Sequence, residues 1–199
     1  MTSILRQVVS GIELGLAMPF WLPVLCSKAM SGSVYARMFQ SGSQTVALFP
    51  GEIGNLIRRG FYRMTLLSCS TRCVISFGTI FSSPRVRIGQ NVYIGAYCSI
   101  ADCSIGDDCM LGSFVSIING RATHNFDRVD VPIRLQGGKS TPVSLDRDCW
   151  VGNGAIVMVD MPVGAVVGAG SVVTKVPERF SISVGNPARA VGSRGMKVG

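Results

Sequence analysis

A six-residue repeat begins near residue 74 and restricts the fold of this chain more than any other feature. Aliphatic residues recur at every sixth position in four runs, and a glycine follows many of them. The runs are Ile88, Ile94 and Ile100; Ile105, Leu111 and Ile117; Leu145, Val151 and Val157; and Val167 and Val173. A helix cannot keep this period on one face, and a lone strand repeats every two residues. A coil with three short sides fits the repeat, so we predict a parallel β-helix.

The repeat also predicts how the coils stack. Because one coil cannot bury its inner face alone, several must lie on one another. Residues 74–199, less one excursion, would hold about five coils of about eighteen residues each. A second row of small apolar residues lies two positions before many members of the first row: Val86, Val92, Cys98, Cys103, Cys109 and Val115. The spacing is short from Ile100 to Ile105 and from Val157 to Val167, and the latter indicates a tightened corner around Met161-Pro162.

One long segment, residues 118–142, interrupts the repeat and has no period of its own. It contains Asn119, Asp127, Asp130 and His124, the only histidine of the chain. Long loops that leave a rigid framework commonly carry function. Histidine has an ordinary pKa of about 6.5, which suits it to exchange protons near neutral pH. We therefore expect residues 118–142 to project from the β-helix as a functional loop.

Residues 1–73 read as a helical segment. From Ile53 to Met64 the apolar residues Ile53, Leu56, Ile57, Phe61 and Met64 are spaced for one helix face, with Arg58, Arg59 and Arg63 expected on the other sides. The helix could cover the open end of the β-helix or lie on an anionic membrane. The apolar stretch of residues 14–26 is short for a membrane span, and Pro19 and Pro23 are expected to break it, so we expect a buried or membrane-surface segment there.

Charge and cysteine content narrow the possible partners. The formal net charge is +8; residues 1–73 carry seven Lys/Arg against two Asp/Glu, and residues 74–199 carry twelve against nine. This excess suits anionic partners. The chain has no long Lys/Arg run and no aromatic array for stacking bases, so we expect no nucleic-acid partner. The seven cysteines show no zinc-site spacing and are expected to be small apolar residues in a reducing compartment.

Four motifs together resemble one known family. They are the repeat with its single-histidine loop, "CWVGNGAIVM" (149–158), "VVGAGSVVTKVP" (166–177) and "SVGNPARAV" (183–191). In this order they resemble the left-handed β-helix, hexapeptide-repeat acyltransferases, in the branch that O-acetylates sugars during surface-polysaccharide assembly. "FPGEIGNLIRRGFYRMTL" (49–66) looks like the lead-in helix of polysaccharide-associated members. The resemblance implies a mainly β, left-handed fold, acetyl-CoA as co-substrate, a saccharide acceptor and a homotrimer with active sites between subunits.

The resemblance also assigns roles to individual residues. His124 matches the general base that takes the proton of an acceptor hydroxyl as the oxygen attacks the thioester. Asn119 and backbone N–H groups near the loop are candidate oxyanion donors, and Asp127, Asp130 or a backbone carbonyl would orient the histidine. Relatives often carry a second histidine in this loop, which is missing here. The expected CoA-binding residues are Trp150 beside the thioester, Gly152, Ala169 and Gly170 along the pantetheine arm, and Thr174, Lys175 and Arg189 near the phosphates and adenine.

Three other functions compete with this interpretation. A carbonic-anhydrase-type β-helix needs three histidines for its zinc ion, and the chain has one, so we expect no metal site. Serine O-acetyltransferases share the fold and the donor but usually have a larger helical domain. A non-catalytic scaffold would not need the loop histidine followed by Trp150. We expect a cytoplasmic enzyme whose basic, apolar residues 1–73 can contact the inner face of the cytoplasmic membrane.

Overall fold

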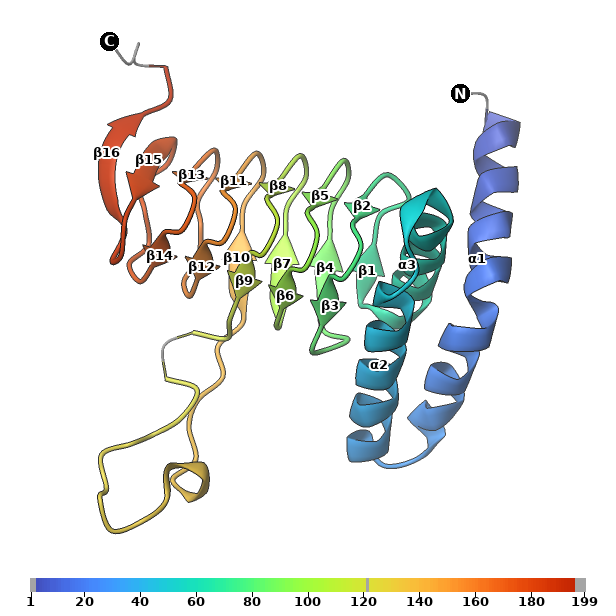
Figure 1. Ribbon diagram of the computed structural model, residues 1–199, viewed down its shortest axis with the longest axis horizontal. Helices are drawn as coiled ribbons and strands as arrows, with labels where there is room; N and C mark the ends of the chain where they lie inside the picture. The colour runs from blue at the N-terminus through green and yellow to red at the C-terminus, as the bar shows by residue number, and fades with distance from the viewer. Residues whose placement is uncertain (1–2, 121, 196–199) are drawn as a thin grey trace.

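The chain folds into a three-sided parallel β-helix with three helices over its N-terminal end (Figure 1). The computed structural model describes residues 3–120 and 122–195. Sheet A contains β1 (Ser68–Cys69), β4 (Arg87–Ile88), β7 (Cys103–Ile105) and β10 (Val143–Leu145). Sheet B contains β2 (Val74–Ile75), β5 (Tyr93–Ile94), β8 (Met110–Leu111), β11 (Trp150–Val151), β13 (Val166–Val167), β15 (Ser181–Val184) and β16 (Arg189–Ser193). Sheet C contains β3 (Ile80–Phe81), β6 (Ser99–Ile100), β9 (Ser116–Ile117), β12 (Ile156–Val157) and β14 (Val172–Val173).

The strands stack in register, and this confirms the predicted β-helix. Every pairing between successive coils is parallel, and only the last pair, β15 with β16, is antiparallel. Five complete turns are followed by β15 as the start of a sixth. All eleven aliphatic residues of the six-residue repeat point inward and are at most 3% exposed. The first strand, β1, lies before residue 74, because coil 1 begins directly after the helices.

The irregularities of the repeat all fall at one corner, where the chain passes from sheet C to sheet A. The corners from A to B and from B to C keep the six-residue spacing, as in Ile88, Ile94 and Ile100. At the C–A corner, β7 follows β6 after a shortened turn, and the projecting segment lies between β9 and β10. One coil later sheet A is reduced to a bridge between Leu145 and buried Met161. One edge of the prism therefore tolerates changes of length, and it is the edge that carries the loop.

The helical segment contains α1 (Ser3–Cys26), the short η1 (Ser27–Ala29), α2 (Gly32–Ala47) and α3 (Gly51–Thr65). The expectation that Pro19 and Pro23 interrupt the apolar stretch is wrong, because α1 runs through both. Each proline removes one backbone hydrogen bond, to the carbonyl four residues earlier. Those carbonyls belong to Gly15 and Pro19, which lie on the exposed side of α1, where they can be solvated.

The helices α2 and α3 satisfy hydrogen bonds that the first coil would otherwise leave open. Arg58, expected on an outer side of its helix, is instead buried, and its guanidinium donates to the carbonyls of Ile75 and Phe49. Ser43 Oγ accepts from the Phe81 N–H at 2.9 Å, and the Gly78 N–H donates to the Ala47 carbonyl. The first coil has no preceding coil to pair with, so these bonds complete its exposed edge. The buried face of α3 is accordingly rotated from the expected one.

Candidate functional site

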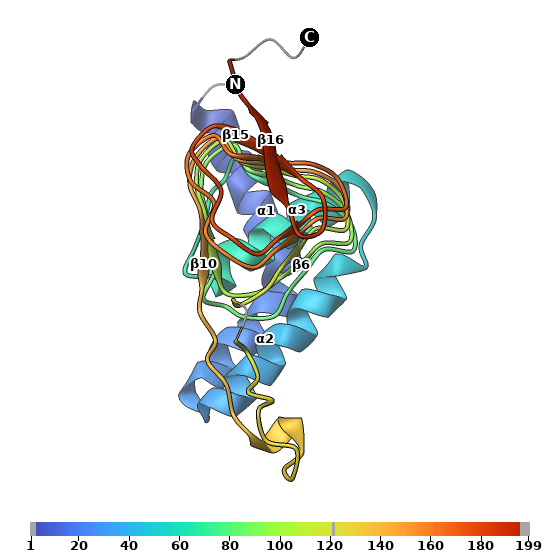
Figure 2. The same cartoon turned by 90° about the vertical axis from the view of Figure 1, so that its left-hand side faces the viewer.

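The segment between β9 and β10 projects from the C–A corner as a long loop, with the short helix η2 (Ile133–Leu135) near its tip (Figure 2). Its two legs are joined by backbone hydrogen bonds. The Thr141 N–H donates to Asn119 O, the Lys139 N–H to Ala122 O and the Asn125 N–H to Gly137 O, at 3.1, 2.7 and 2.9 Å. The loop is thus a ladder of two antiparallel legs.

His124 lies between the last two of these bonds, and its side chain is exposed. Gly138 on the opposite leg passes so close that a Cβ there would lie 2.8 Å from the His124 Cα and 2.1 Å from the Thr123 carbonyl oxygen. The backbone of His124 is therefore fixed by both legs. Its imidazole has no hydrogen-bond partner among residues 3–120 and 122–195, so the ring is available to an external group.

The tip of the loop is organised around Gln136. Its side-chain amide donates to the carbonyls of Arg128 and Val131 and accepts from the Arg128 N–H. The Arg128 guanidinium is paired with Asp130, so the Asp130 carboxylate serves this ion pair and does not contact His124. The hydrogen bond to Arg128 lowers the pKa of Asp130. Asp127 is exposed, and within the described part of the chain it makes no polar contact with His124.

Asn119 lies at the root of the loop, beside Thr141. Its Oδ1 is buried without a hydrogen-bond partner among the described residues. Buried polar atoms normally have a partner, so this atom marks a place where a donor group from outside could bind. The root also borders a cavity of about 260 Å³ whose lining includes Gly120, Thr141 and Asp160.

The outer faces of the sheets differ in polarity. Outward positions of sheet A are polar, namely Arg87, Ser104 and Ser144. Those of sheet B form one apolar stripe across successive strands: Tyr93, Met110, Trp150, Val166 and Ile182. Trp150 lies in the middle of this stripe and is 55% exposed. An exposed row of large apolar side chains indicates a surface that another molecule covers.

A groove of about 280 Å³ follows the corner between sheets B and C. It brings together three of the expected CoA-binding residues, Trp150, Gly152 and Ala169, with Asn153 and Gly168. Gly152 must be small, because a Cβ there would lie 2.5 Å from the Ala169 backbone nitrogen. Gly170 follows Ala169 with φ of +66°. A second cavity of about 490 Å³ adjoins the groove at Trp150 and extends to Asp148 and Arg194, whose side chains form an ion pair.

The backbone N–H groups at this corner follow a pattern that changes inside the groove. In the second and third coils a side chain of the next coil accepts this N–H: Ser113 Oγ accepts from the Ala96 N–H, and Asn153 Oδ1 accepts from the Ser113 N–H at 2.9 Å. The next partner in this column would be Ala169, which has no side-chain oxygen. As a result, the N–H groups of Asn153 and Ala169 have no protein acceptor among the described residues. The groove therefore offers two free backbone donors.

The remaining expected CoA-binding residues lie outside this groove. Thr174 and Lys175 follow β14, on the side of sheet C, and Lys175 is exposed. Arg189 begins β16 and pairs with Val184, whose side chain contacts the Gly168 position at the C-terminal end of the groove. Only Arg189 is thus placed where the groove ends.

The loop and the groove are on opposite sides of the prism. The loop leaves the C–A corner, and sheet B forms the side opposite that corner, as Figures 1 and 2 show. One chain therefore does not bring His124 to Trp150. Among residues 3–120 and 122–195, no group of three His, Cys, Asp or Glu side chains is arranged to hold a metal ion.

Two features of the site escaped the sequence analysis. The first is Asn153, whose side chain accepts from one coil while its own N–H remains free for the groove. The second is the apolar stripe on sheet B. Tyr93, Met110, Trp150 and Val166 each stand directly before an inward aliphatic residue, so the repeat itself could have shown these four.

Comparison with known proteins agrees with this architecture. Residues 85–119 match the bacterial transferase hexapeptide family (six repeats). The galactoside O-acetyltransferase of Escherichia coli K12 is 26% identical over 54% of this chain and 53% of its own length. A dTDP-4-amino-4,6-dideoxy-D-glucose acyltransferase of Escherichia coli is 27% identical over 71% of this chain and 79% of its own length. The chain spans only 38% and 52% of the length of two further acetyltransferases that it matches.

Two solved structures share the fold. A maltose O-acetyltransferase from Clostridium difficile 630 superposes with a TM-score of 0.67, 22% identity and coverage of 79% of this chain and 87% of its own. A variant N-acyltransferase from Bacillus cereus, in complex with dTDP and coenzyme A, superposes with a TM-score of 0.55, 24% identity and coverage of 64% and 73%. Together, the repeat, the stacked parallel coils and the matched region make this chain similar to hexapeptide-repeat transferases, and the two solved structures share its fold.

Proposed function

We propose that this protein is an acetyl-CoA-dependent O-acetyltransferase that acts on a sugar hydroxyl, with His124 as the general base. The observation that carries the proposal is the pair of free N–H groups of Asn153 and Ala169 in the groove beside Trp150. The pantetheine arm of CoA carries two amides, whose carbonyl oxygens accept hydrogen bonds of this kind. At Gly170 a Cβ would meet nothing within 4 Å, so the corner beside the small residues Ala169 and Gly170 leaves room for the arm.

The thioester and the phosphates of CoA would lie toward opposite ends of the arm. Trp150 offers an exposed apolar face for the thioester end. Arg189 is a cation at the C-terminal end of the groove, where it can pair with a phosphate. Lys175 and Thr174 lie on the sheet C side, so their contribution to the phosphates would need the CoA to bend around the end of the prism. We therefore assign the phosphate contact to Arg189 first.

The reaction needs one proton transfer in each direction. The His124 imidazole accepts the proton of the acceptor hydroxyl as its oxygen forms a bond to the thioester carbonyl carbon. The tetrahedral intermediate then breaks its carbon–sulfur bond, and the imidazolium returns the proton to the CoA sulfur. The side-chain amide of Asn119 is a candidate donor to the oxyanion.

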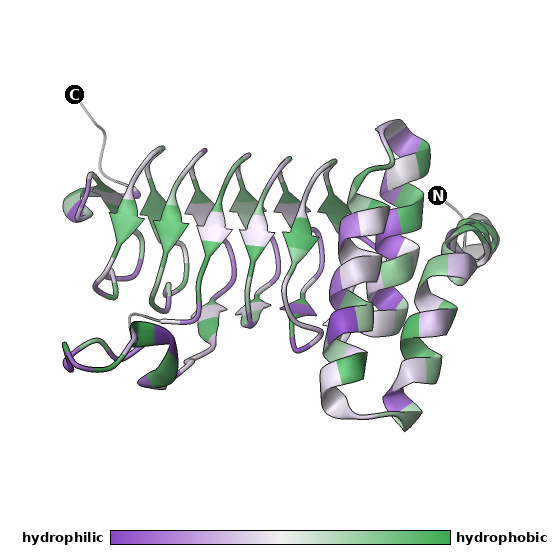
Figure 3. Cartoon of the chain, turned by 60° about the horizontal axis from the view of Figure 1, so that its bottom comes forward, coloured by the Kyte–Doolittle hydropathy of each residue, from purple (hydrophilic) through white to green (hydrophobic). Residues whose placement is uncertain are grey.

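A complete site would require two copies of the chain. The loop carries exposed apolar side chains, namely Phe126, Val129, Ile133 and Leu135. Figure 3 shows hydrophobic (green) and hydrophilic (purple) stretches side by side along this projecting loop. Sheet B carries the exposed apolar stripe around Trp150. If the loop of one copy packs on sheet B of the next, both apolar surfaces are covered and His124 reaches the groove. A closed ring built from this head-to-tail contact accounts for the homotrimer that the family resemblance implies.

The acceptor class rests on the named relatives. The galactoside O-acetyltransferase supports a sugar hydroxyl, and we place the reaction in the assembly of a cell-surface polysaccharide. The relative that matches 71% of this chain is named for a dTDP-amino sugar, which favours acyl transfer to a sugar amine as the second candidate. Both reactions use the same donor and the same base.

The proposal is tested by a screen of acceptors with acetyl-CoA, read by mass spectrometry, with His124→Ala as the blank. The acceptors are free sugars, nucleotide sugars, amino sugars and serine. We expect an acetylated sugar whose formation falls at least about a hundredfold with His124→Ala, while calorimetry shows unchanged CoA binding.

The product distinguishes the candidates. An ester is cleaved by alkaline hydroxylamine and an amide survives, so the treatment separates transfer to oxygen from transfer to nitrogen. Acetylated serine as the main product would make this a serine-type enzyme. Absence of CoA binding at millimolar concentration would contradict any transferase role and favour a scaffold. Equal turnover by His124→Ala would remove the histidine from the mechanism.

A further inference from the structure

The outward side of α1 is unusually apolar for a helix at the end of a molecule. Its exposed large side chains are Val8, Ile12, Leu16, Met18 and Leu22, each between 43% and 52% exposed. No charged residue lies on this side between Gln7 and Cys26. An 18-residue window within Gln7–Ala29 has a mean hydropathy of 1.6, enough for a membrane span by length and composition, and only 17% of that window is buried. We call these five side chains the α1 outer face.

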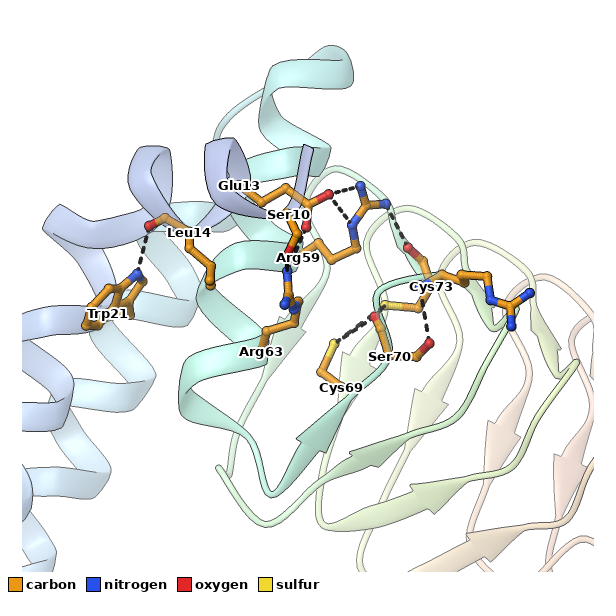
Figure 4. A network of polar contacts seen from close by, with 10 residues as sticks. Ser10, Glu13, Leu14, Trp21, Arg59, Arg63, Cys69, Ser70 and Cys73 are labelled. Atoms are coloured by element: carbon orange, nitrogen blue, oxygen red, sulfur yellow. Dashed lines mark hydrogen bonds and ion pairs between the residues drawn. The ribbon is translucent and has the colours of Figure 1, made fainter. Parts of the chain in front are cut away.

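The one charged residue in this part of α1 points inward. Glu13 is 2% exposed and binds two arginines of α3 (Figure 4). Its Oε1 accepts from Arg59 Nε at 2.9 Å, and its Oε2 accepts from Arg63 Nη1 at 3.1 Å. Arg63 also donates to Ser10 Oγ. The Glu13 carboxylate, which would oppose contact with lipid, is therefore buried and neutralised by arginines on the side of α1 that faces the protein.

The same contacts hold α1 along α3. Gly60 of α3 lies so close that a Cβ there would be 2.3 Å from the Glu13 carbonyl oxygen and 2.9 Å from the Ala17 Cβ. A helix that crossed the membrane alone would have to leave this packing and strand Glu13, Arg59 and Arg63 without partners, which is costly. The α1 outer face is thus presented as a fixed surface, with the helix lying across the end of the β-helix (Figure 1).

The exposed charged residues that follow α1 in the chain are basic. From Gln7 to Phe49 the exposed charged residues are Lys28 and Arg37, and exposed Met30 lies between them in the sequence. An apolar helix face flanked by basic side chains is the arrangement that binds at the interface of anionic lipids.

We infer that the α1 outer face docks flat on an anionic lipid surface, with Lys28 and Arg37 at the headgroups. The β-helix would then stand away from the membrane, because α1 lies beyond α3 and the first coil (Figure 1). This orientation leaves the loop and the groove open at the sides of the prism. The inference stands independently of the transferase activity.

Flotation of the full-length protein with preformed vesicles tests the inference. We expect binding to phosphatidylcholine vesicles with 30% phosphatidylglycerol, weaker binding to phosphatidylcholine alone, and a further fall in 1 M NaCl. Val8→Glu and Ile12→Glu should each lower the vesicle-bound fraction about tenfold. Val191→Glu is the matched control, because Val191 is equally apolar and exposed but lies in β16 at the other end of the molecule. It should bind like the wild type.

A second measurement does not depend on the folding of these variants. In Trp150→Phe the only tryptophan left is Trp21 of α1, and brominated acyl chains should quench its fluorescence in anionic vesicles. Absence of quenching, or equal flotation of all four proteins, would contradict the inference. So would a change in molar mass by light scattering when Val8→Glu or Ile12→Glu is compared with the wild type without lipid, because a second copy would then cover this face.

Discussion

At the scale of single residues, buried charge joins the helical segment to the β-helix. Arg58 is enclosed and donates to two carbonyls, and burial lowers the pKa of its guanidinium. Arg59 binds Glu13 and also donates to the Cys73 carbonyl, and the bond to Glu13 raises the pKa of Arg59. The arginines of α3 therefore contact both α1 and the first coil.

Glu13→Gln should lower the stability of the protein substantially. The change removes the anion between Arg59 and Arg63, whose side chains are 16% and 18% exposed, and breaking such a buried pair costs about 3 kcal/mol. Urea unfolding measures the effect. The control is Asp130→Asn, which breaks the exposed pair with Arg128 and should leave the unfolding midpoint unchanged. Equal midpoints for Glu13→Gln and wild type would show that the Glu13 pair is unimportant.

At the scale of elements, the coil corners decide where side chains can be tolerated. Gly95 lies under the next coil, and a Cβ there would be 2.5 Å from the Gly112 carbonyl carbon and 2.6 Å from the Ser113 nitrogen. At Gly154 a Cβ would meet nothing within 4 Å, but φ is +69°. One corner glycine is thus required by space and the other only by its backbone conformation.

Gly95→Ala should therefore cost more stability than Gly154→Ala. The first substitution forces the coils apart, at about 3 kcal/mol. The second places a side chain on a residue in the left-handed backbone conformation, which costs about 1 kcal/mol. Chemical denaturation of both variants gives the comparison. A larger loss for Gly154→Ala would contradict this account of coil stacking.

A second prediction at this scale concerns the free donors in the groove. In Ala169→Ser the new hydroxyl should accept from the Asn153 N–H, as Ser113 does from the Ala96 N–H at the same corner two coils earlier. One donor is then occupied and the groove is narrower, so we expect CoA to bind about tenfold more weakly by calorimetry. The thermal midpoint should stay the same or rise. Unchanged affinity would exclude the Asn153 N–H as a CoA contact.

Most of the β-helix could be predicted from the sequence, because the six-residue repeat reflects the local geometry of each side of a coil. The spacing of the repeat alone identifies its aliphatic residues as core. The absence of the repeat over residues 118–142 identifies the projecting loop. The helical segment was harder, because its packing depends on the surface it covers. Arg58 was expected on an outer side of its helix, but the Ile75 carbonyl of the first coil and the Phe49 carbonyl between α2 and α3 bind it inside. Spacing also could not show that α1 continues through Pro19 and Pro23, because the carbonyls that lose their hydrogen bonds, those of Gly15 and Pro19, lie on its exposed side.

At the scale of the whole molecule, the positions of the loop and the groove show how a complete site can form. The loop with His124 and the groove with Trp150 lie on opposite sides of one prism. Motif order in the sequence places His124 only 26 residues before Trp150 and gives no sign of this separation. The three-sided coil causes it, because a loop at one corner faces away from the opposite sheet. Assembly of copies is thus central to the account.

The most direct test of this account mixes two inactive variants. His124→Ala lacks the base, and Ala169→Glu blocks the groove, so each alone should transfer no acetyl group. Unfolded together and refolded at equal amounts, they should regain about one quarter of the wild-type rate, because a quarter of the sites then combine an intact loop with an intact groove of the neighbouring copy. The rate is measured as CoA release with the acceptor found in the screen. No regained activity in mixed oligomers would contradict a site shared between copies.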